Sequence, residues 1–265
     1  MADSGRVAHA MLMYENEGCG ALALALAYVQ YLNCTHHVNG DSCGECPSCR
    51  QMTKLIHPDV HYIFPVNKGP KTSDDKPTSE SYIKYWRELA LANPYFTEAD
   101  LQKAIGIESK NGLIAVAEAK HIINTLSLTA VADGYKAVIL YLPEKMNQET
   151  ANRLLKMVEE PPEKTLFIFI THSPEKVLQT IFSRCQSVRV MPLSKEEAEK
   201  VKELNPFDDS EEYDRFMDLF TDLMRAVVSG DLQTGLECGE MAAALESREK
   251  QKAFCTFAGQ CIRKI

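Results

Sequence analysis

Cysteines are the residues whose number and spacing point most clearly to a chemical role in this chain. Four of its nine cysteines fall within sixteen residues: Cys34, Cys43, Cys46 and Cys49. Four thiolates are the full ligand set of a closed tetrahedral zinc site. The short spacings require a tight chain reversal, which Gly40, Gly44 and Pro47 suit. The cluster therefore predicts a structural zinc; unrelated free thiols, or redox chemistry at a C-x-x-C pair, are the alternatives.

A second group of residues lies where nucleotide-binding folds have a phosphate loop. That loop follows the pattern G-x-x-x-x-G-K-[ST], in which the lysine binds phosphate and the hydroxyl binds magnesium. Gly20 keeps the second glycine, and Gly18 lies just before it. The other three positions are changed, to Glu15, Ala21 and Leu22. We expect no ATP to bind, because the cation is missing and a carboxylate is added; an unrelated strand–helix turn is the alternative.

The strand that should supply the magnesium ligand is changed as well. A Walker B strand ends in Asp-Glu, which bind magnesium and orient the attacking water. The apolar run Lys136–Leu142 ends in Tyr141 and Leu142 instead, and Glu144 is a poor substitute two residues later. Two independent losses predict that this domain does not hydrolyse ATP.

An α/β scaffold has to position these residues. Apolar runs predict five strands: Ala10–Met13, Val60–Phe64, Lys136–Leu142, Thr165–Thr171 and Ser187–Val190. The longer runs are nearly continuous, which is typical of parallel strands buried on both faces. Helices are predicted between strands over three segments: Ala21–Leu32, Asn147–Glu160 and Pro174–Phe182. The predicted fold class is therefore α/β, a mostly parallel sheet with helices on both faces.

The pattern changes on the C-terminal side of the last strand. Ser194 and Glu197 have the spacing of a capping box that opens a helix. Further on, apolar residues at helical spacing predict a core-facing stripe: Phe216, Leu219, Phe220, Leu223 and Val227. We therefore divide the chain into an α/β module over 1–192 with the cysteine module at 34–49, a connecting segment over 193–207, and an all-helical domain over 208–265. The polar segment Lys68–Ser81 is predicted to be a solvated loop.

Charge and hydropathy limit the partners. The 265 residues include 29 Lys+Arg and 37 Asp+Glu, a net charge of −8. A freestanding nucleic-acid binder needs a cationic surface, so we expect DNA contact only within an assembly. The longest apolar run, Ala21–Val29, is too short to cross a membrane, and no secretory leader opens the chain. These features predict a cytoplasmic protein in a reducing compartment, where clustered cysteines usually bind metal.

Five segments together resemble a known family. In chain order they are Gly5–Ala10, the cysteine module, His57–Val60, Ala151–Lys156 with Glu159–Pro162, and Ser183–Gln186. On these residues the chain resembles the clamp-loader subunits of bacterial DNA polymerase III, which are AAA+ proteins, and is most similar to their delta-prime type. Tyr135–Lys156 matches without a gap, which places Tyr141 and Leu142 at the Asp-Glu position. The resemblance covers Gly5 to about Leu193 well and the helical tail only loosely.

The resemblance implies a fold and a role. The fold would be an AAA+ α/β module, a helical lid, of which 193–207 would be a remnant, and a helical collar that closes a five-subunit ring. The role would be that of a non-enzymatic subunit that works with motor and delta subunits, the sliding clamp and primer-template DNA. Arg184 would be a finger donated in trans to ATP on a neighbouring motor subunit. Such fingers are worth about 10³–10⁵ in rate in GTPases; a surface ion pair is the alternative role for Arg184.

The chain departs from the family pattern in three places. Only Met1–Ser4 precedes the first matching segment, about fifteen residues separate Pro192 from the collar-like helices, and the collar stops at Ile265. We expect both ends to be trimmed and most of the lid to be missing.

The sequence leaves two other functions open. One is an ATP-hydrolysing, gamma/tau-like motor subunit, which would keep the lysine and Asp-Glu; the other is a zinc-dependent adaptor unconnected with replication.

Overall fold

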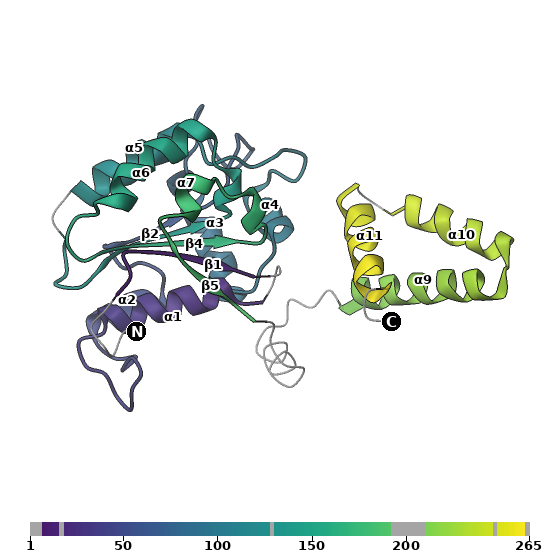
Figure 1. The fold of residues 1–265 in the computed structure, drawn as a ribbon, viewed down its shortest axis with the longest axis horizontal. Helices are drawn as coiled ribbons and strands as arrows, with labels where there is room; N and C mark the ends of the chain where they lie inside the picture. The colour runs from purple at the N-terminus through teal and green to yellow at the C-terminus, as the bar shows by residue number, and fades with distance from the viewer. Residues whose placement is uncertain (1–6, 16–18, 128–129, 192–209, 246–247, 263–265) are drawn as a thin grey trace. The chain divides into compact units, whose positions relative to one another are not determined.

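A five-stranded parallel sheet forms the centre of the larger unit in this computed structural model (Figure 1), which describes residues 7–15, 19–127, 130–191, 210–245 and 248–262. The strands are β1 (Ala10–Tyr14), β2 (Val60–Ile63), β3 (Lys136–Tyr141), β4 (Thr165–Thr171) and β5 (Gln186–Arg189), in the order β2-β3-β4-β1-β5. All four neighbouring pairs are parallel. Thr171 is paired with Tyr14, and Ile170 with Tyr141, so the carboxyl ends of β1, β3 and β4 meet at one edge.

Helices cover both faces of this sheet, because side chains alternate between two cores. Met11 and Met13 lie in the core formed with α1 (Ala21–Asn33), α3 (Ser79–Ala92) and α4 (Glu98–Ile105). Ala10 and Leu12 lie in the opposite core, with α5 (Val116–Ser127), α6 (Gln148–Glu159) and α7 (Gln179–Phe182). Figure 1 shows α1 on one side of the sheet and α5, α6 and α7 on the other. The predicted fold class is therefore confirmed.

Two predicted segments differ from the structure. The helix expected over Pro174–Phe182 is instead a short 3₁₀ turn, η3 (Pro174–Lys176), followed by the separate α7. Val177 and Leu178 between them are extended, which lets Val177 bury its side chain in the second core. The loop expected over Lys68–Ser81 ends early, because Thr78 forms a capping box with Ser81 and α3 begins at Ser79.

The chain divides into two compact units, Met1–Lys200 and Val201–Ile265. The described part of the second unit contains α9 (Ser210–Ser229), α10 (Leu232–Ala243) and α11 (Arg248–Ile262). Its core includes Phe216, Leu219 and Phe220, as the helical spacing predicts. Val227 was wrongly assigned to that stripe, since it is 66% exposed and Ala226 is buried instead. The reason is that α10 packs on the Ala226 side, where a Cβ added to Gly235 would lie 3.9 Å from the Ala226 Cβ.

Some predictions lie outside the described residues. These are Gly18, the capping box at Ser194 and Glu197, and the segment 193–207. The three-part division of the chain therefore remains a prediction. Within the described ranges, none of the helices has the length and apolar character needed to cross a membrane.

Candidate functional sites

The four clustered cysteines converge on one point. The Sγ atoms of Cys34, Cys43, Cys46 and Cys49 all lie within 4.8 Å of one another. Cys34, Cys46 and Cys49 are buried, and Cys43 is partly buried. A tetrahedral metal centre with Zn–S distances of about 2.3 Å needs its sulfurs roughly this close together. The group could therefore hold a metal ion, with four thiol ligands and no open position.

Local backbone geometry explains how the cysteines meet. After α1, Val38 and Asp41 pair across a turn in which Asn39 and Gly40 have φ of 54° and 80°. Asn-Gly is the sequence best suited to such a turn, because both central residues need positive φ. Gly44 also has a positive φ, of 72°. The expected turning role of both glycines is thereby confirmed.

Backbone N–H groups in this module donate to sulfur. Cys43 N–H donates to Cys34 Sγ at 3.2 Å, and Cys46 N–H donates to Cys43 Sγ at 3.3 Å. Cys49 N–H donates to Cys46 Sγ at 3.4 Å, at the start of α2 (Pro47–Thr53). The hydrogen bond from Cys46 N–H lowers the pKa of the Cys43 thiol. Donors aimed at sulfur stabilise the thiolate, which is the form that binds metal.

The loop after β1 places a carboxylate at the start of α1. Glu15 is only 8% exposed, and its Oε2 accepts a hydrogen bond from Ala21 N–H at 2.7 Å. Its Oε1 lies 3.5 Å from His172 Nε2. The first N–H groups of a helix have no partner within the helix and attract anions, which is how a phosphate loop holds phosphate. Here a carboxylate of the chain itself takes one of these donors.

The other described residues that were predicted to form an altered phosphate loop are packed against other residues. Ala21 and Leu22, at the lysine and hydroxyl positions, are buried in the core between α1 and the sheet. Gly20 has φ of 102°, and a Cβ added there would lie 2.6 Å from the Tyr95 ring. The Tyr95 ring therefore covers the turn. Sequence reasoning missed Tyr95, because it comes from the loop after α3, far away in sequence.

The two residues predicted to stand at altered Walker B positions are also buried. Tyr141 is 3% exposed, and its ring centroid lies 5.3 Å from that of Phe96 and 5.5 Å from that of His172. Leu142 is buried next to it. His172 was missed, although it directly follows β4 at the edge where the strands end, which is the signal that could have found it.

Glu144 lies at the same strand edge but has a partner within the chain. Its Oε2 accepts a hydrogen bond from Thr171 Oγ1 at 2.8 Å, and burial raises its pKa. Thr171 Oγ1 in turn accepts from Ser173 N–H at 3.0 Å. These bonds tie the turn after β3 to the end of β4, which supports the expectation that Glu144 is a poor substitute for a magnesium ligand.

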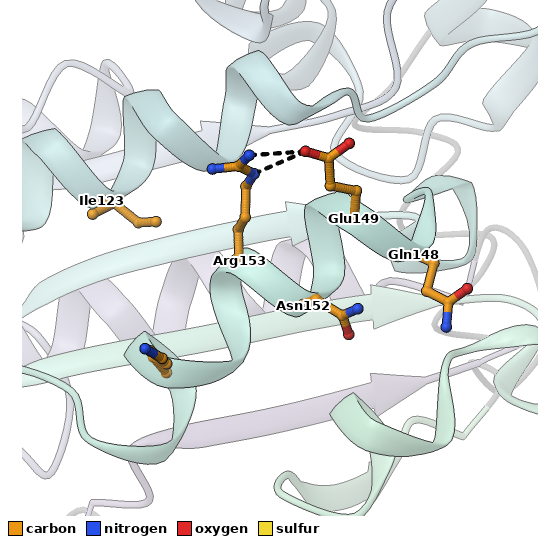
Figure 2. Close-up of a pocket in the computed structure, with 6 residues that line it drawn as sticks. Ile123, Gln148, Glu149, Asn152 and Arg153 are labelled. Carbon is orange, nitrogen blue, oxygen red and sulfur yellow. Dashed lines mark hydrogen bonds and ion pairs between the residues drawn. The ribbon is translucent and has the colours of Figure 1, made fainter.

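Two matched segments have structural roles that their residue types did not reveal. Asp59, from the segment His57–Val60, accepts hydrogen bonds from Val131 N–H and Ala132 N–H, both at 2.8 Å, and so holds the approach to β3. In the segment Ala151–Lys156, Ala151 and Leu154 pack in the second core, while the other side of α6 lines a shallow pocket with Ile123 of α5 (Figure 2).

Figure 2 also shows that Arg153, one of the two cationic side chains that line this pocket, folds back on its own helix. Arg153 Nη2 donates to Glu149 Oε1 at 2.8 Å, one helical turn away. This exposed i,i+4 pair makes Arg153 part of the helix surface.

Arg184 is exposed after α7, and its guanidinium is held by the chain. Its Nε donates to Oε1 of Glu159, the last residue of α6. Its Nη1 donates to Thr180 O at 2.8 Å and to Ser183 Oγ at 3.3 Å. The ion pair considered as an alternative role for Arg184 is therefore present.

These features define a class of protein. The parallel sheet, the strand–turn–helix at β1, and the cysteine module after α1 are those of a P-loop-type α/β module with a cysteine-rich insertion. The family model described as DNA polymerase III, delta subunit, matches residues 1–194, and the chain belongs to that family.

A delta' relative agrees with this assignment, and two other proteins show more distant similarity. DNA polymerase III subunit delta' of Yersinia pestis is 32% identical over 182 residues, covering 69% of this chain and 41% of that protein. DNA polymerase III subunit gamma/tau of Mycobacterium bovis is 29% identical over 182 residues, covering 69% of this chain and 24% of its own length. A solved gamma subunit-related protein of Thermotoga maritima has 16% identity and a TM-score of 0.38, covering 95% of this chain and 73% of its own. The chain thus spans less than half the length of the delta' and gamma/tau relatives that it matches.

Proposed function

We propose that this chain acts as a delta-prime-like subunit of a DNA polymerase III clamp loader, without hydrolysing ATP itself. In that role it would help to load the sliding clamp onto primed DNA, in a ring with motor and delta subunits. Because the chain belongs to this family, one observation carries the proposal that it does not hydrolyse ATP. The Glu15 carboxylate occupies the N–H donor at the start of α1 where a phosphate would bind.

Physical chemistry supports the loss of ATP binding. A triphosphate would have to displace Glu15 from Ala21 N–H or lie beside its negative charge. At the lysine position it would find Ala21, which is in the core, and at the end of β3 it would find Tyr141, which is packed against Phe96. A gamma/tau-like motor subunit needs these groups.

Arg184 would then supply the subunit's contribution to chemistry, as a finger in trans. Its guanidinium is exposed at the end of α7 and always charged. Placed against the γ-phosphate of ATP on a neighbouring motor subunit, it would offset the negative charge that spreads over the phosphate oxygens in the transition state.

The cysteine module would hold one structural zinc through Cys34, Cys43, Cys46 and Cys49. The sulfurs fit a closed tetrahedral site and receive N–H donors that favour thiolate. The zinc would fix the loop between α1 and α2 and leave no position for substrate.

Reconstitution tests the proposed function. The full chain is mixed with motor and delta subunits, the mass of the complex is measured, and clamp loading and DNA-stimulated ATP turnover are assayed. We expect complex formation with Arg184→Ala to be unchanged and turnover to fall by at least about 10-fold. Failure of the parent chain to enter the complex would overturn the proposal and favour an unconnected zinc-dependent adaptor. Unchanged turnover with Arg184→Ala would remove the finger alone.

A further inference from the structure

The hydrogen bonds of Arg184 engage some of the nitrogen atoms of its guanidinium and leave another one available. A guanidinium has five N–H donors on Nε, Nη1 and Nη2. Nε donates to Glu159, and Nη1 donates to Thr180 O and Ser183 Oγ. Within the part of the chain that the structure describes, Nη2 makes no hydrogen bond to the protein. Its two donors are therefore the ones that an external acceptor can use.

Glu159 is well placed to create this division. It ends α6 just before Pro161-Pro162, where the helix cannot continue, so its backbone is anchored by a helix whose apolar side lies in the core. The Glu159 side chain is 41% exposed and that of Arg184 is 35% exposed. Ion pairs with such exposure contribute little to folding stability. Loss of Glu159 should therefore leave the fold intact, so that a functional effect can be measured separately.

We propose that Glu159 is a positioning residue: it holds Arg184 by Nε and leaves Nη2 for the γ-phosphate of ATP bound to a neighbouring subunit. The inference rests on the proposed function of Arg184. A free arginine has many rotamers, and ordering them when the ring forms lowers the gain from each new hydrogen bond. With Nε and Nη1 already held, less freedom is lost when the phosphate arrives. The ion pair and the finger are thus two aspects of one arrangement.

Glu159 could act on the finger in two ways, by holding the Arg184 side chain or by its negative charge, and these two explanations predict different results. A carboxylate near the guanidinium reduces the net positive charge that the phosphate experiences. If Glu159 acts by holding the side chain, Glu159→Gln keeps an acceptor oxygen and should preserve the effect. If only the negative charge mattered, Gln would behave like Ala.

The test uses the full chain, reconstituted with motor and delta subunits, and DNA-stimulated ATP turnover as the readout. Glu159→Ala should lower turnover at saturating ATP by about 3- to 10-fold, the factor expected for one side chain that is no longer held in advance. The KM for ATP and the mass of the complex should stay unchanged, because the finger acts in the transition state. Glu159→Gln should remain within about 2-fold of the parent. Glu160→Ala, at the neighbouring exposed carboxylate, is the matched control and should have no effect.

Two further variants separate this inference from the proposed function. Arg184→Ala comes first: if it leaves turnover unchanged, Arg184 is not a finger and both ideas fail. If Arg184→Ala lowers turnover while Glu159→Ala leaves it unchanged or raises it, only the positioning role of Glu159 is overturned. In the Arg184→Ala background, Glu159→Ala should cause no further loss. An additional loss there would show that Glu159 acts through another group and would also overturn the inference.

Discussion

Glu15 shows how a single side chain can close a ligand site. A helix N-terminus keeps its affinity for anions whatever residues surround it, because that affinity comes from backbone N–H groups and the helix dipole. In this chain the anion is internal: Glu15 Oε2 lies 2.7 Å from Ala21 N. Glu15 therefore caps the helix at the kind of position where a phosphate loop holds phosphate.

The first prediction concerns ATP. Titration of the isolated chain with ATP-Mg should give no measurable heat, because Ala21 stands at the lysine position and Glu15 accepts the hydrogen bond from Ala21 N–H. Glu15→Ala should still bind no ATP, but should lose about 1–2 kcal/mol of unfolding free energy in urea through the lost cap. Glu88→Ala, on the exposed side of α3, is the control and should change stability little. Micromolar ATP binding by the parent would restore the motor-subunit interpretation.

The second prediction concerns Glu118, a buried carboxyl group in α5. It accepts a hydrogen bond from Ser79 N–H at the start of α3, yet burial raises its pKa to about 7. An unfolded Glu has a pKa of about 4.3, so the folded state binds this proton more tightly. The resulting stability is present in full below about pH 4 and is lost as the pH rises through about 7.

Urea unfolding of Glu118→Gln at pH 5 and pH 8 checks this linkage. The unfolding free energy of the parent should fall between these pH values relative to that of the variant, by at most on the order of 3 kcal/mol. Subtracting the variant removes the contribution of other titrating groups, including the buried His57, whose pKa burial lowers. Glu88→Gln should reproduce the parent's pH dependence. Equal pH dependence in parent and Glu118→Gln would contradict the prediction.

At the scale of elements, the strands and their burial on both faces can be predicted from the sequence better than the short helices can. The predicted strand β4 has the observed bounds Thr165–Thr171, because a run of β-branched and aromatic residues leaves little choice. Pro174–Phe182 has helical composition, yet the burial of Val177 breaks it into two turns. The prediction that Val227 faces the core was wrong for a similar reason: spacing alone cannot distinguish Val227 from Ala226 until the position of α10 is known.

The candidate sites show the same difference between features that are local in the sequence and contacts between distant segments. The cysteine cluster and its turning glycines are local in sequence, so spacing was enough to predict that the sulfurs meet. The altered phosphate loop stays a prediction from missing residues, and the side chains beside Gly20 and Glu15 come from distant segments: Tyr95 from the loop after α3 and His172 from the end of β4. Side-chain contacts between distant segments depend on rotamers and packing, which a single sequence does not encode locally.

The third prediction belongs to the cysteine module as an element. The purified chain should contain about one zinc per molecule. Removing the metal with a chelator should loosen α2 and the turns before it, because four ligands would hold this segment and Met52 is its contact with the main hydrophobic core. Hydrogen exchange should therefore rise in 34–53 while β1, β3 and β4 keep their protection. Cys46→Ser should lose zinc and Cys255→Ser, an exposed thiol on α11, should keep it. Absence of zinc from the parent, or equal loss of protection in the sheet, would contradict the prediction.

At the scale of the whole molecule, charge bears on whether the isolated chain can bind DNA. The net charge is −8, and several lysines that could offset it have partners within the chain. Lys68 pairs with Asp75, Lys145 pairs with Glu98, and buried Lys136 donates to Leu126 O. Cations engaged in this way are less available to displace counterions from phosphate. With the net charge of −8, these pairings lead us to expect weak binding of the isolated chain to a polyanion.

The last prediction follows from that charge distribution. In fluorescence anisotropy with a labelled primer-template at about 0.15 M salt, the isolated chain should show no binding up to about 10⁻⁴ M, the weak end of the non-specific Kd range of DNA-binding proteins. The complex with motor and delta subunits, measured with the same probe and salt, serves as the positive control and should bind. Lowering the salt should strengthen binding by the isolated chain only slightly, because few phosphates are neutralised and few counterions are released. Micromolar binding by the isolated chain with a steep salt dependence would mean that it carries a cationic DNA surface of its own, and a role confined to the assembled ring would then be wrong.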